Sequence, residues 1–297
     1  MLKKIGLLMG LVTCIYLNTN TFVLAGEPAL ATAPSKFVKL DGTKIHYKEF
    51  GKGKTALVFV HGWTCNLNFW KGQIPAVAKD THLIALDLPG HGQSDKPELP
   101  VYSMAYFAKA VDAVLTQAKV DHAVLIGHSM GTPVIREYYR LFPKKVTALV
   151  AVDGAFRPFL TDQTQIDQFI GLYAKPDYKE FMGKMVESMF PNPAQTTLRD
   201  EVKAQMLAAP QYVVVGAMKG MLDQSIWKDD KVDVPVLHIL SKSPMWSADY
   251  EKYVRTIAAK TEYTQMDGVG HFLMMEKPDE FNHILHDFLK KNGMVKK

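Results

Sequence analysis

Residues 123–141 read AVLIGHSMGTPVIREYYRL, and this stretch decides the fold. It begins as an apolar run, continues through GHSMG at 127–131, and passes into a stretch with helical periodicity. Glycine and serine are common residues, so the pattern G-x-S-x-G alone is a weak signal. Between a strand and a helix, however, it is typical of a sharp turn that exposes a serine hydroxyl at the edge of the sheet. The flanking glycines are needed there because neighbouring chains leave no room for a Cβ atom. The sequence therefore predicts Ser129 as a nucleophile.

Other short apolar runs along the chain predict further strands. They do not alternate with polar residues, which indicates strands covered on both faces, as in a parallel α/β sheet. Helix-period stretches at 104–118 and 133–141 separate some of them, which is typical of βαβ units. Near the start, two strand-like segments at 37–40 and 45–50 are joined by the turn signal Asp41-Gly42. The apolar runs lie at 56–60, 83–86, 123–126, 148–152 and 236–240.

One long interval, residues 153–235, breaks this alternation because it contains no clear core strand. An insertion of this length is expected to pack as a small subdomain. Its periodicity is helical, with breaks at Pro176, Pro191, Pro193 and Pro210. Its methionine and aromatic side chains either fill the interior of the subdomain or line an adaptable apolar pocket. They include Phe169, Tyr173, Phe181, Met182, Met185, Met189, Phe190, Met206, Met218 and Met221.

Three further motifs follow predicted strands or precede a predicted helix. HGWT at 61–64 follows the run at 56–60, and DLPGHGQSD at 87–95 follows the run at 83–86. GHF at 270–272 is followed by EKPD and a closing helix from Asp279. Together with GHSMG and in this order, these motifs resemble the α/β-hydrolase superfamily of serine hydrolases. The resemblance covers roughly residues 36–292.

The resemblance implies a mostly parallel, eight-stranded α/β sheet flanked by helices, with a helical cap inserted after the sixth strand. The core then comprises residues 36–153 and 228–297, and the cap comprises residues 154–227. The resemblance also implies that His271 is the base that takes the proton of Ser129, since a serine hydroxyl is a poor nucleophile by itself. The backbone N–H groups of Trp63 and Met130 are expected to form the oxyanion hole.

The other titratable residues of the motif loops are expected to be structural. By resemblance, His61, His91 and His128 support the loops and take no part in proton transfer. Cys65 lies next to the oxyanion motif and is expected to be a buried, inert thiol.

The third member of a catalytic triad is expected at an unusual place. Many members of the superfamily carry the acid just after the strand that corresponds to 236–240, but here the following residues are SKSPMW, without a carboxylate. A branch of the superfamily carries the acid at the end of the preceding strand, where this chain has Asp153. Because adjacent strands end side by side, either place reaches the same imidazole. Asp153 is therefore the expected acid, and Asp249 is the alternative.

A serine at the elbow argues against haloalkane dehalogenases and epoxide hydrolases of the superfamily, which use aspartate there. The expected reaction is cleavage of a carboxylic ester of a small to medium, largely apolar substrate, without cofactor or metal. Lactone hydrolysis, C–C bond hydrolysis and cofactor-free perhydrolysis are alternatives on the same triad. Ligand binding with little turnover is a non-enzymatic alternative, because fold does not fix function. The aromatic residues Phe156, Phe159 and Phe272 are expected to contact the substrate.

The amino terminus has the pattern of an export signal. Two lysines precede an apolar run over 5–17, and small residues end at Ala25, which predicts cleavage after that residue and release outside the cytoplasm. Residues 26–35 are expected to form a flexible tail. The run is short for a membrane span, and Cys14 is a weak candidate for a lipid anchor. Loss of two lysines lowers the formal charge from +5 to +3, and no dense basic run predicts a nucleic-acid partner.

Overall fold

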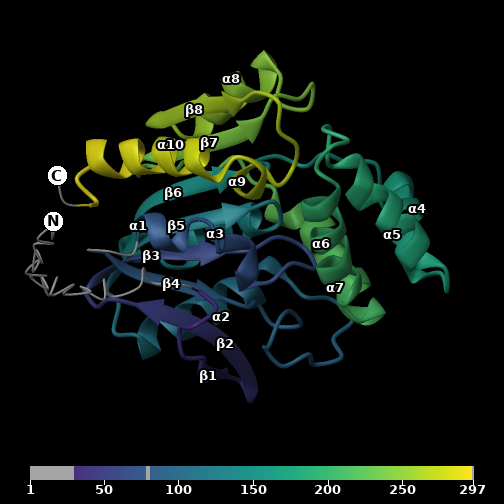
Figure 1. Cartoon of the computed structure of the whole chain (residues 1–297), viewed down its shortest axis with the longest axis horizontal. Coiled ribbons are helices and arrows are strands. Elements are labelled where there is room, and N and C mark those ends of the chain that lie inside the picture. Colours follow the sequence, from purple (N-terminus) through teal and green to yellow (C-terminus); the bar gives the residue numbers. More distant parts are fainter. Residues whose placement is uncertain (1–29, 78–80, 296–297) are drawn as a thin grey trace, which may run out of the picture.

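The computed structural model describes residues 30–77 and 81–295. An eight-stranded sheet flanked by helices forms its framework (Figure 1). The predicted apolar runs each form a strand, because an apolar strand without alternation can be covered on both faces. The strands are β1 Lys36–Leu40, β2 Thr43–Phe50, β3 Thr55–Val60, β4 His82–Leu86, β5 His122–His128, β6 Val146–Val152, β7 Val236–Ser241 and β8 Thr261–Met266.

The strand order is β1-β2-β4-β3-β5-β6-β7-β8. Strands β1 and β2 form an antiparallel pair, β2 also pairs antiparallel with β4, and every pair from β4 to β8 is parallel. The predicted fold class is therefore confirmed. Strand β8 has the sequence TEYTQM, which lacks an apolar run because the strand lies at the edge of the sheet and is only partly buried.

The helical stretches predicted at 104–118 and 133–141 and the closing helix expected from Asp279 each correspond to a helix of the core. Ser103 caps α2 by accepting a hydrogen bond from the Tyr106 N–H, which satisfies one free donor of the first turn. Helix α2 packs against α3, and α3 packs against β5 and β6. The core helices are α1 Ile74–Val77, α2 Met104–Gln117, α3 Gly131–Leu141, α8 Ala248–Ile257, α9 Leu273–Glu276 and α10 Pro278–Lys291.

Four helices lie between β6 and β7 and gather beyond one end of the sheet (Figure 1). They are α4 Gln163–Ala174, α5 Tyr178–Ser188, α6 Thr196–Leu207 and α7 Gln211–Leu222. The prolines at which helix breaks were predicted lie between these helices, because proline cannot continue a helix. Residues 154–227, which contain these helices, are called the cap below. The division of the chain into a core at 36–153 and 228–297 and a cap subdomain at 154–227 stays a prediction.

Arg136 on α3 joins both ends of the cap to the core. Its guanidinium donates to the carbonyl of Phe156 at 2.6 Å, where the cap begins, and to the carbonyl of Lys228 at 2.8 Å, just beyond its end. Asp230 accepts a further hydrogen bond at 3.1 Å. Burial of this charge is compensated because its N–H groups have acceptors in place of water. The start and end of the insertion are therefore fixed to the helix that follows Ser129.

In the segment before β1, Leu30 is buried in the core, and its carbonyl accepts a hydrogen bond from the Lys48 ammonium at 2.7 Å. The flexible tail expected at residues 26–35 stays a prediction. The expected export signal, its cleavage after Ala25, and Cys14 lie outside the described residues. Within the described part, no helix is long and apolar enough to cross a membrane.

Candidate active site

Ser129 occupies a strained turn between β5 and α3. Its φ is +54°, a left-handed conformation that non-glycine residues rarely adopt. The turn is fixed because the Ser129 N–H donates to the Val152 carbonyl at 2.9 Å. A Cβ on Gly127 would lie 2.6 Å from the carbonyl carbon of Gly131, and one on Gly131 would lie 2.5 Å from the Val60 oxygen. Neither glycine position of the motif therefore has room for a side chain, and the tight turn leaves Ser129 partly exposed at the end of the sheet.

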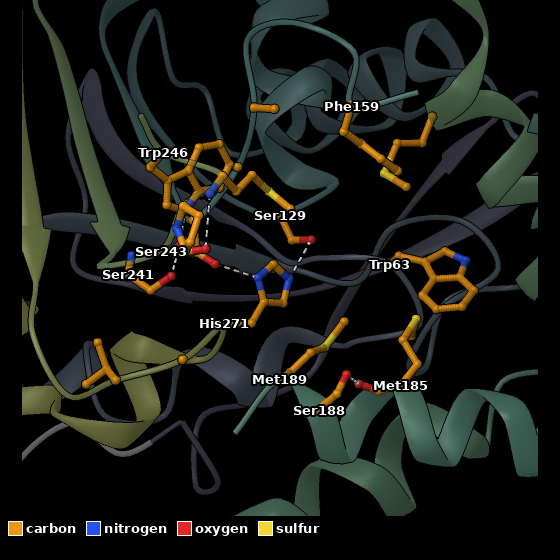
Figure 2. A pocket seen from close by; sticks show the side chains of 18 of the residues that line it. Trp63, Ser129, Phe159, Met185, Ser188, Met189, Ser241, Ser243, Trp246 and His271 are labelled. Atoms are coloured by element: carbon orange, nitrogen blue, oxygen red, sulfur yellow. Dashed lines mark hydrogen bonds and ion pairs between the residues drawn. The ribbon is translucent and has the colours of Figure 1, made fainter. Parts of the chain in front are cut away.

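His271 lies in the loop between β8 and α9 and contacts both other candidate residues (Figure 2). Its Nδ1 lies 2.6 Å from Oδ2 of Asp153, and its Nε2 lies 2.9 Å from Oγ of Ser129. Because a carboxylate only accepts, Nδ1 carries the proton and donates a hydrogen bond to Asp153. In the neutral ring Nε2 is then free to accept from the Ser129 hydroxyl. The structure brings these three sequence-predicted residues together in the order that proton transfer requires.

Asp153 follows β6 directly and also has a positive φ, +42°. Its second oxygen, Oδ1, accepts three hydrogen bonds: from Ser241 N–H at 2.8 Å, from Ser241 Oγ at 2.9 Å and from Trp246 Nε1 at 3.0 Å. Burial favours the neutral acid, but the hydrogen bond to His271 and those from Ser241 prevail and lower the pKa of Asp153. The carboxylate is therefore held in its charged form.

The alternative acid, Asp249, lies elsewhere. It is an exposed residue in the first turn of α8, where a carboxylate interacts favourably with the helix N-terminus. The loop after β7 instead supplies Ser241 and Trp246, which sequence reasoning missed. The sequence carried only an indirect signal for these two residues. The loop after β7 has no carboxylate at the usual acid position, and in its place it carries hydrogen-bond donors for the carboxylate at the end of β6.

His128 supports His271 from the core. Its Nε2–H donates to the backbone carbonyl of His271 at 2.8 Å, and the two rings lie 4.8 Å apart. Burial lowers the pKa of His128 to about 3, so the ring is neutral near pH 7. His61 accepts from the Leu88 N–H through Nε2 and donates from Nδ1 to the Gly62 carbonyl. These contacts hold the motif loops together.

The expected oxyanion donors belong to two segments near Ser129. Met130 is the N-cap residue of α3, and at a helix N-terminus the N–H groups without a helical partner and the helix dipole favour negative charge. A Cβ on Gly62 would lie 3.1 Å from the Ser129 Cβ, so the backbone leading to Trp63 passes close to the serine. The Trp63 indole donates to the carbonyl of Val214 on α7 at 2.9 Å. Cys65 is buried, and burial raises the pKa of its thiol, so the thiolate is disfavoured.

A cavity of about 510 Å³ contacts Ser129 and His271 and lies between the core and the cap. Figure 2 shows Trp63, Met185 and Met189 on one side of His271 and Ser241, Ser243 and Trp246 on the other. Apolar side chains dominate the cap side of the lining, which is typical of sites for small organic ligands. They are Phe159, Phe169, Met185, Met189, Pro191, Met218, Met221 and Trp227.

Only one of the three phenylalanines expected to contact substrate lines this cavity. Phe159 does so and is 46% exposed. The expectation is wrong for Phe156, which is buried between Arg136 and His238. It is also wrong for Phe272, which is buried against aromatic rings of the core and cap. Both lie next to site residues in sequence, but their side chains point into the interior because burial there removes a large apolar area from water.

No group of three or more His, Cys, Asp or Glu side chains suited to a metal ion occurs within residues 30–77 and 81–295.

Comparison with known proteins identifies the class that this sheet and site define. The family model for the alpha/beta hydrolase fold matches residues 55–204. The chain belongs to this family.

Curated relatives include two bacterial proteins that the chain matches over most of its length. It is 29% identical over 280 residues to the dihydrolipoyllysine-residue acetyltransferase component of an acetoin cleaving system from Pseudomonas putida, covering 91% of this chain and 74% of that protein. It is 25% identical over 253 residues to the AB hydrolase superfamily protein YisY of Bacillus subtilis, covering 81% and 93%.

Similar solved structures include Est816, described as an N-acyl homoserine lactone degrading enzyme. It has a TM-score of 0.69 and 26% identity, and the match covers 85% of this chain and all of that one. An esterase from Exiguobacterium antarcticum has a TM-score of 0.76 at 20% identity, with 86% and 100% covered, which shows the fold alone.

Proposed function

We propose that this protein is a serine hydrolase that cleaves carboxylic esters of small to medium, largely apolar substrates through an acyl-enzyme. The observation that carries the proposal is the contact of His271 with Ser129 Oγ at 2.9 Å and with Asp153 at 2.6 Å, at the wall of an apolar cavity. A nucleophile within hydrogen-bond reach of a base that a third group orients is the arrangement that acyl transfer requires.

In the first half of the proposed reaction, Ser129 Oγ attacks the ester carbonyl while His271 Nε2 takes the hydroxyl proton. Asp153 stabilises the imidazolium that forms and keeps the ring in the productive tautomer. The N–H groups of Met130 and Trp63 stabilise the tetrahedral oxyanion, a contribution of about 3 to 4 kcal/mol per donor in comparable sites. His271 then protonates the leaving alkoxide, and an acyl-Ser129 ester remains.

In the second half, water attacks the acyl-enzyme with His271 as base, and collapse of the second oxyanion releases the acid and restores Ser129. The cap supplies most of the apolar wall of the cavity, so it acts as the lid that selects substrate size. Transfer of the acyl group to peroxide in place of water, and cleavage of activated C–C bonds, are variants that the same residues support.

Lactone hydrolysis is the second candidate, because Est816, at 26% identity, is described as an N-acyl homoserine lactone degrading enzyme. A lactone is a cyclic ester, and the same triad opens it without a separate leaving alcohol. The apolar cap wall of the cavity suits an acyl chain next to the ring. A rate panel of linear esters of increasing acyl length, acyl lactones and amides decides between these substrates.

The test of the serine mechanism uses a fluorophosphonate probe together with a p-nitrophenyl ester. Wild-type protein is expected to hydrolyse the ester and to become labelled, whereas Ser129→Ala should lose both properties and keep the wild-type circular dichroism spectrum. Turnover by Ser129→Ala at the wild-type rate contradicts the assignment of the nucleophile. Absence of labelling and turnover in the wild type favours the alternative of a ligand-binding protein.

A further inference from the structure

The end of cap helix α5 contacts the loop of His271 directly. Helix α5 ends at Ser188, and the carbonyl of the next residue, Met189, accepts a hydrogen bond from the His271 N–H at 3.1 Å. The last carbonyl groups of a helix have no partner within the helix. Here a backbone donor of the candidate base supplies one, so the cap and the catalytic loop share a hydrogen bond.

Gly270 makes this approach possible. A Cβ atom on Gly270 would collide with the Met189 carbonyl oxygen and lie 2.6 Å from Cδ of Pro191. Both neighbours are backbone or ring atoms with little freedom to move. The absence of a side chain at position 270 is therefore required by the cap segment 189–191 and not by the core alone.

Phe190 adds a side-chain contact at the same place. Its ring stacks on that of Phe272, with centroids 5.4 Å apart and planes 17° from parallel. Phe272 is fully buried and also packs against Phe69 and His128 of the core. Offset-stacked aromatic pairs stabilise beyond their buried area. Phe190 therefore anchors the cap to the residue next to His271.

The backbone of His271 is consequently held from two sides. The cap accepts from its N–H through Met189, and the core donates to its C=O through His128 at 2.8 Å. Without the cap contact, the backbone of His271 itself keeps only its bond with His128, while Glu276 binds the neighbouring residues by accepting from the Gly270 N–H and donating to the Phe272 carbonyl. The imidazole must keep its place between Ser129 and Asp153, so a freely moving loop reduces the populated fraction of the aligned triad.

We propose that cap segment 189–191 is a positioning element for His271, with Phe190 as its positioning residue, so that the triad is aligned only while the cap is seated. The proposal rests on the proposed serine hydrolase function. Met189 and Pro191 also line the cavity, and Figure 2 shows Met189 beside His271. A substrate that fills the cavity therefore contacts the segment that holds the base.

The kinetic test compares Phe190→Ala with Phe181→Ala on a short acetyl ester. Phe181 is an aromatic residue of α5, the helix that precedes Phe190; its ring packs on Tyr173 within the cap and does not line the cavity. Phe190→Ala should lower kcat about 10- to 100-fold, because displacement of a catalytic group by an ångström has effects of this size, and should leave KM for the short ester nearly unchanged. Phe190→Leu should recover most of kcat, and Phe181→Ala should keep the wild-type kcat.

A second measurement does not depend on turnover. Hydrogen exchange followed by mass spectrometry on peptides that contain residues 270–272 should show faster exchange of the His271 amide in Phe190→Ala than in wild type or Phe181→Ala. Gly270→Ala should behave as Phe190→Ala does in both assays. Wild-type kcat and wild-type exchange in folded Phe190→Ala overturn the inference. A wild-type protein without esterase activity or fluorophosphonate labelling overturns the proposed function instead, and the exchange result still decides whether the cap fixes the loop.

Discussion

The core side and the cap side of the cavity are built in different ways. On the core side, Ser129 and Asp153 lie at strand ends with positive φ, and hydrogen bonds fix each of them. On the cap side, methionine and aromatic side chains form most of the wall, with a few hydrogen bonds beside them, such as that of the Ser188 hydroxyl to the Met185 carbonyl at 2.7 Å. The core side is held by directional contacts, whereas the cap side is held by apolar packing.

This difference indicates how tolerance to substitution is distributed. A hydrogen-bonded carboxylate has one productive geometry, so loss of a partner reduces the rate of the chemical step. A methionine side chain is unbranched and adapts its shape to neighbouring groups, so changes there should alter which substrates fit. The expected ranking is therefore large effects on turnover from the core side and smaller effects on selectivity from the cap side.

The largest effect is expected from Asp153→Asn. The amide keeps the size of the carboxylate but does not stabilise the imidazolium and favours the wrong tautomer of His271, so turnover of a simple ester should fall about 10⁴-fold. The measurement is kcat/KM, with circular dichroism to establish folding. The matched control, Asp249→Asn, changes an exposed carboxylate of α8 and should retain nearly full activity. Collapse of the control alone would place the acid on the later strand.

A smaller loss is expected from Trp246→Phe, which removes one of three donors to Asp153 Oδ1 and retains an aromatic ring. A hydrogen bond to a charged group contributes about 1.5 kcal/mol or more, so turnover should fall about tenfold while Ser241 keeps the carboxylate in place. Trp70→Phe is the control, because Trp70 is also buried and its indole N–H has no acceptor in the described part of the chain. Equal rates for the two variants would show that the hydrogen bond from Trp246 does not support catalysis.

The smallest effect on turnover, but a clear one on selectivity, is expected from Met221→Ala on the cap side. The extra space should shift the preference toward longer acyl chains, by about fourfold in relative kcat/KM for each methylene newly accommodated. Met182→Ala is the control, since Met182 is fully buried within the cap and does not line the cavity. The comparison is a kcat/KM series over acyl length. An unchanged profile in Met221→Ala argues against a lid that selects substrate size.

Local sequence patterns determined the class of fold, the insertion after β6, and the residues of the elbow. Their signals are short-range: an apolar run defines a buried strand, glycines mark a turn without room for Cβ, and proline ends a helix. The resemblance to the α/β-hydrolase superfamily predicted Asp153 as the acid, and the side-by-side ends of adjacent parallel strands explain why a carboxylate there can reach His271. Strand β8 was not found from its own residues because an edge strand need not be apolar.

Tertiary structure alone decided how distant segments meet. Ser241 and Trp246 donate to a carboxylate on another strand, and no local pattern specifies a contact across 88 or 93 positions. Phe156 and Phe272 turned out to be core residues because side-chain direction depends on which elements surround a loop. The contact of Met189 with His271 likewise exists only after the cap docks. Interactions between residues close in sequence specify the strands, helices and turns, whereas the contacts of a side chain with distant residues follow from the packing of the whole fold.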